Sequence, residues 1–189
     1  MTYRAADGPL VEPLAGLLGE EPGDTRRIAF EEVPIAVADD LSLVGPIAGR
    51  GRVARTNRGL LLQLEASATI TAACVRCLEP IEVPLDVRID EEILPSIDFA
   101  TGAPLDVTAE PEVARLDDHH RLDLEPLLRD AISLAEPIAP LCRPDCPGLC
   151  PTCGERLTGD AVHDHGDDEI DPRLEALRRF AVDDRDENR

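Results

Sequence analysis

Residues 59–90 read GLLLQLEASATITAACVRCLEPIEVPLDVRID, and apolar and polar side chains alternate on both sides of a C-x-x-C pair. An alternation with a period of two is typical of β-strands that have one buried and one solvated face. The stretch therefore predicts two adjacent antiparallel strands, Gly59–Ala73 and a second one from Ile81 to Ile89. Cys74 and Cys77 fall on the connection between them, in a turn of the kind that a metal ion can hold.

Two further strands and a helix are predicted on the N-terminal side of this pair. Leu41–Arg55 reads as a strand that reaches the next one through Thr56–Gly59, a sequence suited to a hairpin turn. A shorter strand is expected from Arg26 to about Ile35. Leu10–Leu18 is expected to form a short helix, which Pro22-Gly23 would close.

An amphipathic helix is predicted on the C-terminal side. Asp123 suits its N-cap, Pro126 its first turn, and Pro137 its end. Its apolar positions follow i, i+3, i+4, i+7 spacing and would pack on the sheet. These positions are Leu124, Leu127, Leu128, Ala131, Ile132 and Ala135.

The segments on either side of this helix are less regular. Pro95 to His120 is acidic and rich in Pro and Ala, so we expect a mobile surface loop in which His119 and His120 are solvated. Asp171-Pro172 is expected to open a last short helix near the C-terminal end.

Composition narrows the classes of partner. Of 189 residues, 43% are hydrophobic but only 2% are aromatic, so the core must be aliphatic and there are few rings on which bases could stack. The net charge of −20 repels phosphate backbones and attracts basic partners. The sequence shows neither a secretory signal nor a run of eighteen apolar residues, which predicts a cytoplasmic protein that does not enter a membrane.

One segment is locally basic. Between Leu41 and Leu78 the only acidic residue is Glu65. The same segment contains the arginines Arg50, Arg52, Arg55, Arg58 and Arg76. They are candidates for contact with RNA or a protein partner, although arginines spread along strands usually form only a solvated face.

The cysteines and two histidines form the candidate metal ligands: Cys74, Cys77, Cys142, Cys146, Cys150, Cys153, His163 and His165. In a reducing compartment such clusters indicate metal binding rather than disulfides, and zinc is the metal that these donors favour. The segment after the amphipathic helix has few apolar side chains to offset the ~1–2 kcal/mol per residue that backbone ordering costs. A four-ligand zinc site contributes on the order of 10–16 kcal/mol in small peptides.

Two ligand assignments are open. The preferred one has two sites, the first formed by Cys150, Cys153, His163 and His165 and the second by Cys74, Cys77, Cys142 and Cys146. The alternative is one compact site of Cys142, Cys146, Cys150 and Cys153, with Cys74 and Cys77 left without metal. In either case four protein ligands close the site, which indicates a structural role.

An enzyme is the competing interpretation. Cys74 and Cys77 could serve a thiol-redox or zinc-dependent reaction, but redox C-x-x-C motifs act from a helix N-terminus beside a βαβ unit, whereas strands flank this one. No phosphate-binding glycine loop is present. We therefore predict no catalytic residues and no small-molecule substrate.

Several strings resemble the YceD family, the large ribosomal RNA subunit accumulation proteins. They are RRIAFEEVPI (26–35), CVRCLEPIE (74–82), DLEPLLRDAISLAEPIAPLCRPDCPGLCPTCGERL (123–157) and IDPRLEALRRF (170–180). In many members a C-x-C pair takes the positions of His163 and His165, and some members have lost most of the cysteines. The resemblance thus implies that the metal stabilises the protein rather than carrying out chemistry.

The resemblance implies a non-enzymatic role in producing or maintaining large-subunit ribosomal RNA. Family genes often lie beside one for a small protein of the large subunit, so the partner expected is a basic ribosomal protein or a large-subunit assembly intermediate. The fold expected is α+β: an antiparallel β-sheet with a packed amphipathic helix and a C-terminal zinc-bound element. The core domain would span 1–141, and 142–189 would hold the zinc element, an acidic tail and a short terminal helix.

Overall fold

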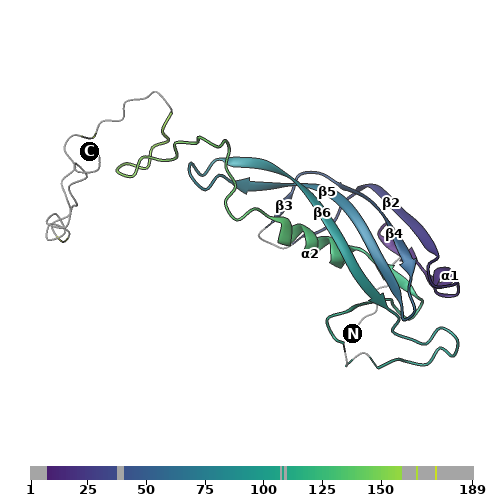
Figure 1. Ribbon diagram of the computed structural model, residues 1–189. Coiled ribbons are helices and arrows are strands. Elements are labelled where there is room, and N and C mark those ends of the chain that lie inside the picture. Colours follow the sequence, from purple (N-terminus) through teal and green to yellow (C-terminus); the bar gives the residue numbers. More distant parts are fainter. Residues whose placement is uncertain are drawn as a thin grey trace, which may run out of the picture. The chain divides into compact units, whose positions relative to one another are not determined.

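Two long strands, β5 (Leu60–Ala73) and β6 (Pro80–Leu94), form the centre of the fold (Figure 1). They pair antiparallel without a register shift, from Leu60 opposite Ile93 to Ala73 opposite Pro80. The computed structural model describes residues 8–37, 41–106, 108, 110–158, 165 and 173. The chain divides into two compact units, Met1–Cys146 and Pro147–Arg189. Both long strands belong to the first unit, and the predicted strand pair is confirmed.

Five strands of the six-stranded sheet lie in the order β2-β4-β5-β6-β7, and the sixth, β3, also pairs with β5. β2 (Thr25–Val33) and β4 (Ile47–Arg55) are antiparallel to their neighbours, whereas β7 (Ala114–Arg115) runs parallel to the end of β6. With one main helix packed against it, this mixed but mostly antiparallel sheet confirms the α+β class.

The prediction of one continuous strand over Leu41–Arg55 is wrong. The structure has two strands there, β3 (Ser42–Leu43) and β4, and both pair with β5. The chain turns between them at Gly45, whose φ of 82° favours glycine, and Pro46 follows.

The prediction of a helix over Leu10–Leu18 is wrong in its first half. Only Ala15–Leu18 is helical (α1), while Val11–Pro13 forms β1, which pairs antiparallel with β8 (Arg121–Asp123). Hydrogen bonds from Leu14 N–H to the His120 carbonyl and from Leu124 N–H to the Leu10 carbonyl continue this pairing. The partner strand is more than a hundred residues away in the sequence, so a local pattern does not reveal it.

The segment from Pro95 to His120 is more ordered than the sequence predicts. It contains β7 and the fully buried Leu116, whose N–H donates to the Leu94 carbonyl. His120 is half-buried, with its ring 5.4 Å from that of Phe99, so the prediction that it is solvated is wrong. A neighbouring ring therefore takes the place of water on one side of His120.

The predicted helix is confirmed as α2 (Glu125–Ala135). Leu128 and Ile132 are fully buried, and the helix packs against β6. Its N-cap is Leu124 rather than the predicted Asp123, yet the Asp123 carboxylate still accepts a hydrogen bond from the Glu125 N–H. That bond satisfies one of the free amide groups at the start of the helix.

The core is aliphatic, as the composition predicts. The inward face of β5 and β6 supplies much of it, and β2, β4, β8, both helices and the segments that connect them supply the rest. Its largest fully buried members are Leu14, Leu17, Ile47, Leu60, Leu62, Leu64, Ile70, Ile93, Leu116, Leu122, Leu124 and Leu128. No polar residue is buried among those that the structure describes. Within the same residues, the helices are too short or too polar to cross a bilayer.

The second unit has one described turn. Leu149 and Arg156 form an isolated antiparallel bridge, and Cys150 and Cys153 lie between them. The predicted terminal helix after Asp171 lies outside the described residues, apart from Arg173.

Candidate metal centre

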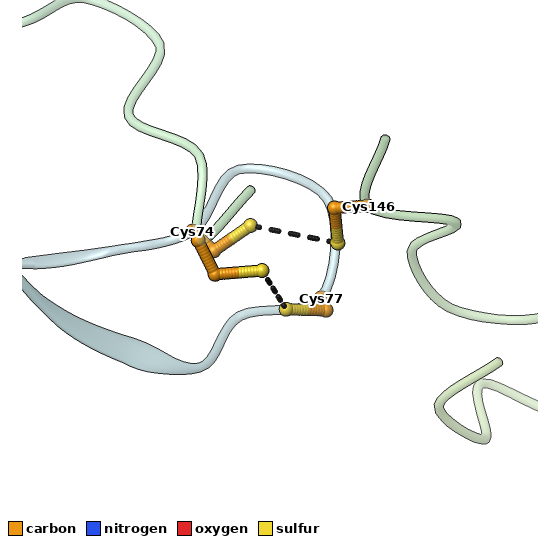
Figure 2. A group of neighbouring side chains, drawn as sticks. Cys74, Cys77 and Cys146 are labelled. Carbon is orange, nitrogen blue, oxygen red and sulfur yellow. Dashed lines mark hydrogen bonds between the residues drawn. The ribbon is translucent and has the colours of Figure 1, made fainter. Parts of the chain in front are cut away.

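The turn between β5 and β6 carries the first C-x-x-C pair. The Cys74 N–H donates to the Glu79 carbonyl (2.8 Å), and the Leu78 N–H donates to the Cys74 carbonyl (2.8 Å). Leu78 closes the turn with a φ of 60°, a left-handed conformation that is uncommon outside glycine. These bonds place the two thiols on one side of the connection, as Figure 2 shows.

The segment after α2 is bonded to this turn. The Val75 N–H donates to the Pro140 carbonyl at 3.0 Å. The Arg76 guanidinium donates through Nη1 to the carbonyls of Pro144 (3.3 Å) and Cys146 (2.9 Å). The turn thereby holds residues 140–146 through main-chain and side-chain bonds, independently of any sulfur.

This arrangement brings four thiols together. The sulfur atoms of Cys74, Cys77, Cys142 and Cys146 all lie within 4.8 Å of one another. The Cys74 and Cys146 sulfurs are 3.9 Å apart (Figure 2). Those of Cys77 and Cys142 are 3.7 Å apart. All four are free cysteines, and all but Cys142 are buried. The cluster could hold a metal ion, and its members match one set of the preferred assignment.

The thiols of the cluster differ in the direction in which their pKa values are shifted. Main-chain N–H groups, first that of Cys142 and then that of Cys77, lower the pKa of the Cys74 thiol to about 6. A hydrogen bond with Cys146, together with burial, raises the pKa of the Cys142 thiol to about 12. For Cys77 the Glu79 N–H favours the thiolate, but burial and the sulfurs of Cys74 and Cys146 raise the pKa. Four adjacent thiolates need a cation, and a bound divalent ion would supply it.

A second group of donors lies in the second unit. The donor atoms of Cys150, Cys153 and His165 are within 4.8 Å of one another, and Cys150 Sγ lies 3.1 Å from His165 Nε2. The pKa of Cys150 is lowered to about 6, mainly by the Cys153 N–H and then by those of Thr152 and the His165 ring. His163, the fourth predicted ligand, lies outside the described residues.

The two C-x-x-C turns share one hydrogen-bond pattern. In the second turn the Cys150 N–H donates to the Glu155 carbonyl (2.7 Å) and the Gly154 N–H donates to the Cys150 carbonyl (2.8 Å). Gly154 has a φ of 73° and so takes the place of Leu78. Both turns read C-x-x-C-x-E, a repeat that is visible in the sequence and that our sequence analysis missed.

A third group of donors combines one half-buried residue with two exposed ones. Atoms of Asp117, Asp118 and His119 also lie within 4.8 Å of one another. Asp117, however, accepts hydrogen bonds from Arg121 and from the His119 N–H, and His119 Nδ1 lies 2.6 Å from Asp118. The Asp117 carboxylate therefore stabilises the loop in which it lies.

The five arginines of the locally basic segment have different surroundings. Arg55 donates to the carbonyls of Leu18 and Gly59, and Arg58 pairs with Glu92 and Glu110. Arg76 binds the segment after α2, as described above.

The other two lie on the solvated face of the sheet. Arg52 donates to Gln63 (2.7 and 2.9 Å), while Arg50 has no ion-pair or hydrogen-bond partner for its side chain within the described part of the chain. Four of the five side chains thus bond to other parts of the fold, and contact with RNA remains a prediction.

Comparison with known proteins supplies the family. A family model described as large ribosomal RNA subunit accumulation protein YceD matches residues 62–181. Uncharacterized proteins of Mycobacterium bovis and Mycobacterium tuberculosis are each 39% identical over 126 residues, which are 67% of this chain and 58% of theirs. An uncharacterized protein of Mycobacterium leprae is 33% identical over 177 residues, 90% of this chain and 77% of its own.

The chain therefore spans less than two thirds of the length of the first two relatives. No solved structure matches it. The family match extends from β5 through α2 and includes both cysteine groups. On this match the chain belongs to the YceD family of large ribosomal RNA subunit accumulation proteins.

Proposed function

We propose that this chain is a non-enzymatic ribosome-biogenesis factor that supports the accumulation of large-subunit ribosomal RNA. The observation that carries the proposal is the family match over residues 62–181, more than half of the chain. We further propose that it acts in the cytoplasm, by binding a basic ribosomal protein or a large-subunit assembly intermediate. The net charge of −20 supports this partner class, since it attracts cationic surfaces and repels phosphate backbones.

The metal is proposed to be zinc, in a structural role. Zinc–thiolate bonds of about 2.3 Å in a tetrahedron place sulfur atoms about 3.8 Å apart. The separations of 3.7 and 3.9 Å in the first cluster agree with that geometry. Four cysteines would fill the coordination shell and leave no position for water or substrate, as in structural sites.

The alternative function is a thiol-redox or zinc-dependent enzyme that uses Cys74 and Cys77. It has less support, because Cys74 and Cys77 lie in a turn between two strands, whereas redox C-x-x-C motifs act from a helix N-terminus beside a βαβ unit. The rate at which an alkylating reagent modifies the thiols distinguishes a structural site from an enzyme. A structural site protects its thiols until a chelator removes the metal, whereas a catalytic thiol of low pKa reacts at once.

Depletion of the protein from its own host tests the function directly. We expect the ratio of large-subunit to small-subunit ribosomal RNA to fall and to recover when the wild-type chain is supplied. The variant Cys74→Ser/Cys77→Ser should restore the ratio in proportion to the amount of folded protein, because the thiols do no chemistry. An unchanged ratio after depletion would refute the proposal. If the Cys74→Ser/Cys77→Ser protein is full-length and stably folded but does not restore the ribosomal RNA ratio, the enzyme is favoured instead.

A further inference from the structure

The outer edge of β6 is open along most of its length. One side of the strand pairs with β5 throughout, but on the other side β7 pairs only with Ile93 and Leu94. From Pro80 to Glu92 that edge has no partner strand in the described part of the chain. An edge of this length presents a row of main-chain donors and acceptors that another strand can use.

The register shows which residues present those groups. The Leu94 carbonyl accepts from Leu116 and so faces away from β5. In an antiparallel ladder the outward-facing main-chain groups recur at every second residue. Asp86, Arg88 and Asp90 therefore direct their N–H and C=O groups to the open edge. Pro84, which lacks an N–H, belongs to the same set, as expected of a proline in an edge strand.

A groove runs between this edge and α2. Its volume is about 820 Å³. Val87 and Ile89 contribute from β6, and Leu127, Ala131 and Leu134 contribute from the helix. Leu134 is 87% exposed and so is open to contact with an occupant of the groove. A strand added to β6 would place alternate side chains over this apolar wall.

The groove is acidic as well as apolar. Six acidic residues are among those that line it: Asp86, Asp90, Glu91, Glu112, Asp123 and Asp130. Two arginines also line it: Arg88, which pairs with Asp90, and Arg115, which donates to the carbonyls of Pro95 and Glu110. With six acidic residues against two arginines, the lining carries a net negative charge, which favours a cationic occupant.

We propose that the open edge of β6 binds an extended, Arg/Lys-rich polypeptide segment as an additional strand. Basic side chains of that segment would meet Asp86 on β6 and Asp130 on α2, and apolar ones would pack against Leu127 and Leu134. Main-chain hydrogen bonds supply affinity in this mode of recognition, and the alternating side chains supply specificity. The inference deepens the proposed function and rests on it for the client, a basic ribosomal protein.

Two other occupants fit less well. A second copy paired antiparallel about Arg88 would place Asp86 of one copy opposite Asp90 of the other, and like charges directly opposite each other are destabilising. RNA would bring phosphates to the same carboxylates. The charge therefore favours a basic protein segment over either one.

Amide hydrogen exchange on the full-length, zinc-loaded protein tests the proposal. The probe is a synthetic peptide of alternating Arg and Val residues, and its control is the same peptide with N-methylated main-chain amides. We expect the unmodified peptide to slow exchange at the amides of Asp86, Arg88 and Asp90, and the methylated one to do so much less.

The variant Asp86→Asn/Asp130→Asn should weaken binding by about threefold or more per charge removed. The matched control Glu20→Gln/Glu21→Gln removes equal charge outside the groove and should bind as the wild type does.

Several results would overturn the proposal. They are the absence of binding, protection at sites other than the β6 edge, equal binding of the methylated peptide, or equal weakening by the control variant. A molecular mass that doubles with concentration, with the β6 amides already protected, would assign the edge to a second copy.

The peptide result is independent of the proposed function. Strand addition together with an unchanged ribosomal RNA ratio after depletion would refute the function alone, and no peptide binding together with a lowered ratio would refute the groove alone.

Discussion

The guanidinium of Arg76 donates to the main-chain carbonyl of Cys146 at 2.9 Å. This bond connects the first C-x-x-C turn to the segment that carries Cys142 and Cys146. The same Nη1 also reaches the Pro144 carbonyl. The arginine sits between the two cysteines that begin the site, while its contacts lie about seventy residues further along the chain. It is therefore a positioning residue for the cluster, acting through the loop that carries Cys142 and Cys146.

Replacing this arginine should loosen the metal site without unfolding the sheet. We expect Arg76→Gln to lower zinc affinity by about tenfold, because a hydrogen bond to a charged group contributes on the order of 1.5 kcal/mol. Competition with a chromophoric chelator measures the affinity. Arg50→Gln is the matched control, since Arg50 has no described partner, and it should leave the affinity unchanged. Equal affinities for all three proteins would mean that the Arg76 bonds do not position the loop.

Gly51 in β4 should tolerate no side chain. It lies opposite Ile28 of β2 and Leu64 of β5. A Cβ there would overlap the Gln63 carbonyl and stand 2.7 Å from the Leu64 Cα, and these are backbone atoms that cannot rotate away. We expect Gly51→Ala to lower the free energy of unfolding by about 1–3 kcal/mol, measured by urea denaturation.

Gly16 provides the matched glycine control. It lies in α1, where the nearest atom to an added Cβ is Nη2 of Arg26, at 4.0 Å. Gly16→Ala should therefore be neutral or stabilise by about 0.5 kcal/mol through lower chain entropy of the unfolded state. A Gly51→Ala protein as stable as Gly16→Ala would show that the β4–β5 pairing can open at this point without cost.

The elements that the sequence predicts correctly are those with long local patterns. The alternation in β5 and β6 and the spacing of Leu128 and Ile132 in α2 each encode one buried face within a single segment. β1 fails this condition, since three residues carry no period and its pairing with β8 depends on contacts across the whole unit. The break between β3 and β4 was predictable, because Gly45-Pro46 is a turn signal.

The grouping of the thiols is a tertiary property. Spacing alone left two assignments open, since Cys142 and Cys146 lie near Cys150 and Cys153 in the sequence. The structure places them with Cys74 and Cys77 because α2 packs on β6 and the chain after it passes the β5–β6 turn, where Val75 and Arg76 bind it. The distance between cysteines in the sequence therefore does not predict which of them lie together, because the chain after α2 passes the β5–β6 turn.

Stability should depend on the charge state of Asp90. Hydrogen bonds from the Arg88 guanidinium and then from the Gln63 amide lower the pKa of this carboxyl. A folded-state pKa below the unfolded value of about 3.9 gives a stabilising contribution that is present above about pH 4. That contribution is lost as the pH falls through the folded-state pKa. We therefore expect Asp90→Asn to be less stable than wild type at pH 7, and the two to converge below about pH 4.

Urea unfolding at a series of pH values measures this difference. In the background Arg88→Gln, where the main donor is absent, the effect of Asp90→Asn at pH 7 should be smaller, because the interaction energy between the two side chains is no longer there to lose. A difference between Asp90→Asn and wild type that stays constant from pH 3 to pH 7 would show that the ionised carboxylate does not contribute.

Metal analysis should find two zinc ions per chain, each removable by a separate substitution. Cys74 belongs to the four-cysteine cluster of the first unit, whereas Cys150 lies with Cys153 and His165 in the second. We expect Cys74→Ser to release one ion and Cys150→Ser the other, as measured by mass spectrometry of the native protein. His119→Ala, in the exposed group beside Asp118, is the control and should retain both ions. One ion in the wild type, kept in Cys74→Ser and lost in Cys150→Ser, would instead support the compact site of Cys142, Cys146, Cys150 and Cys153.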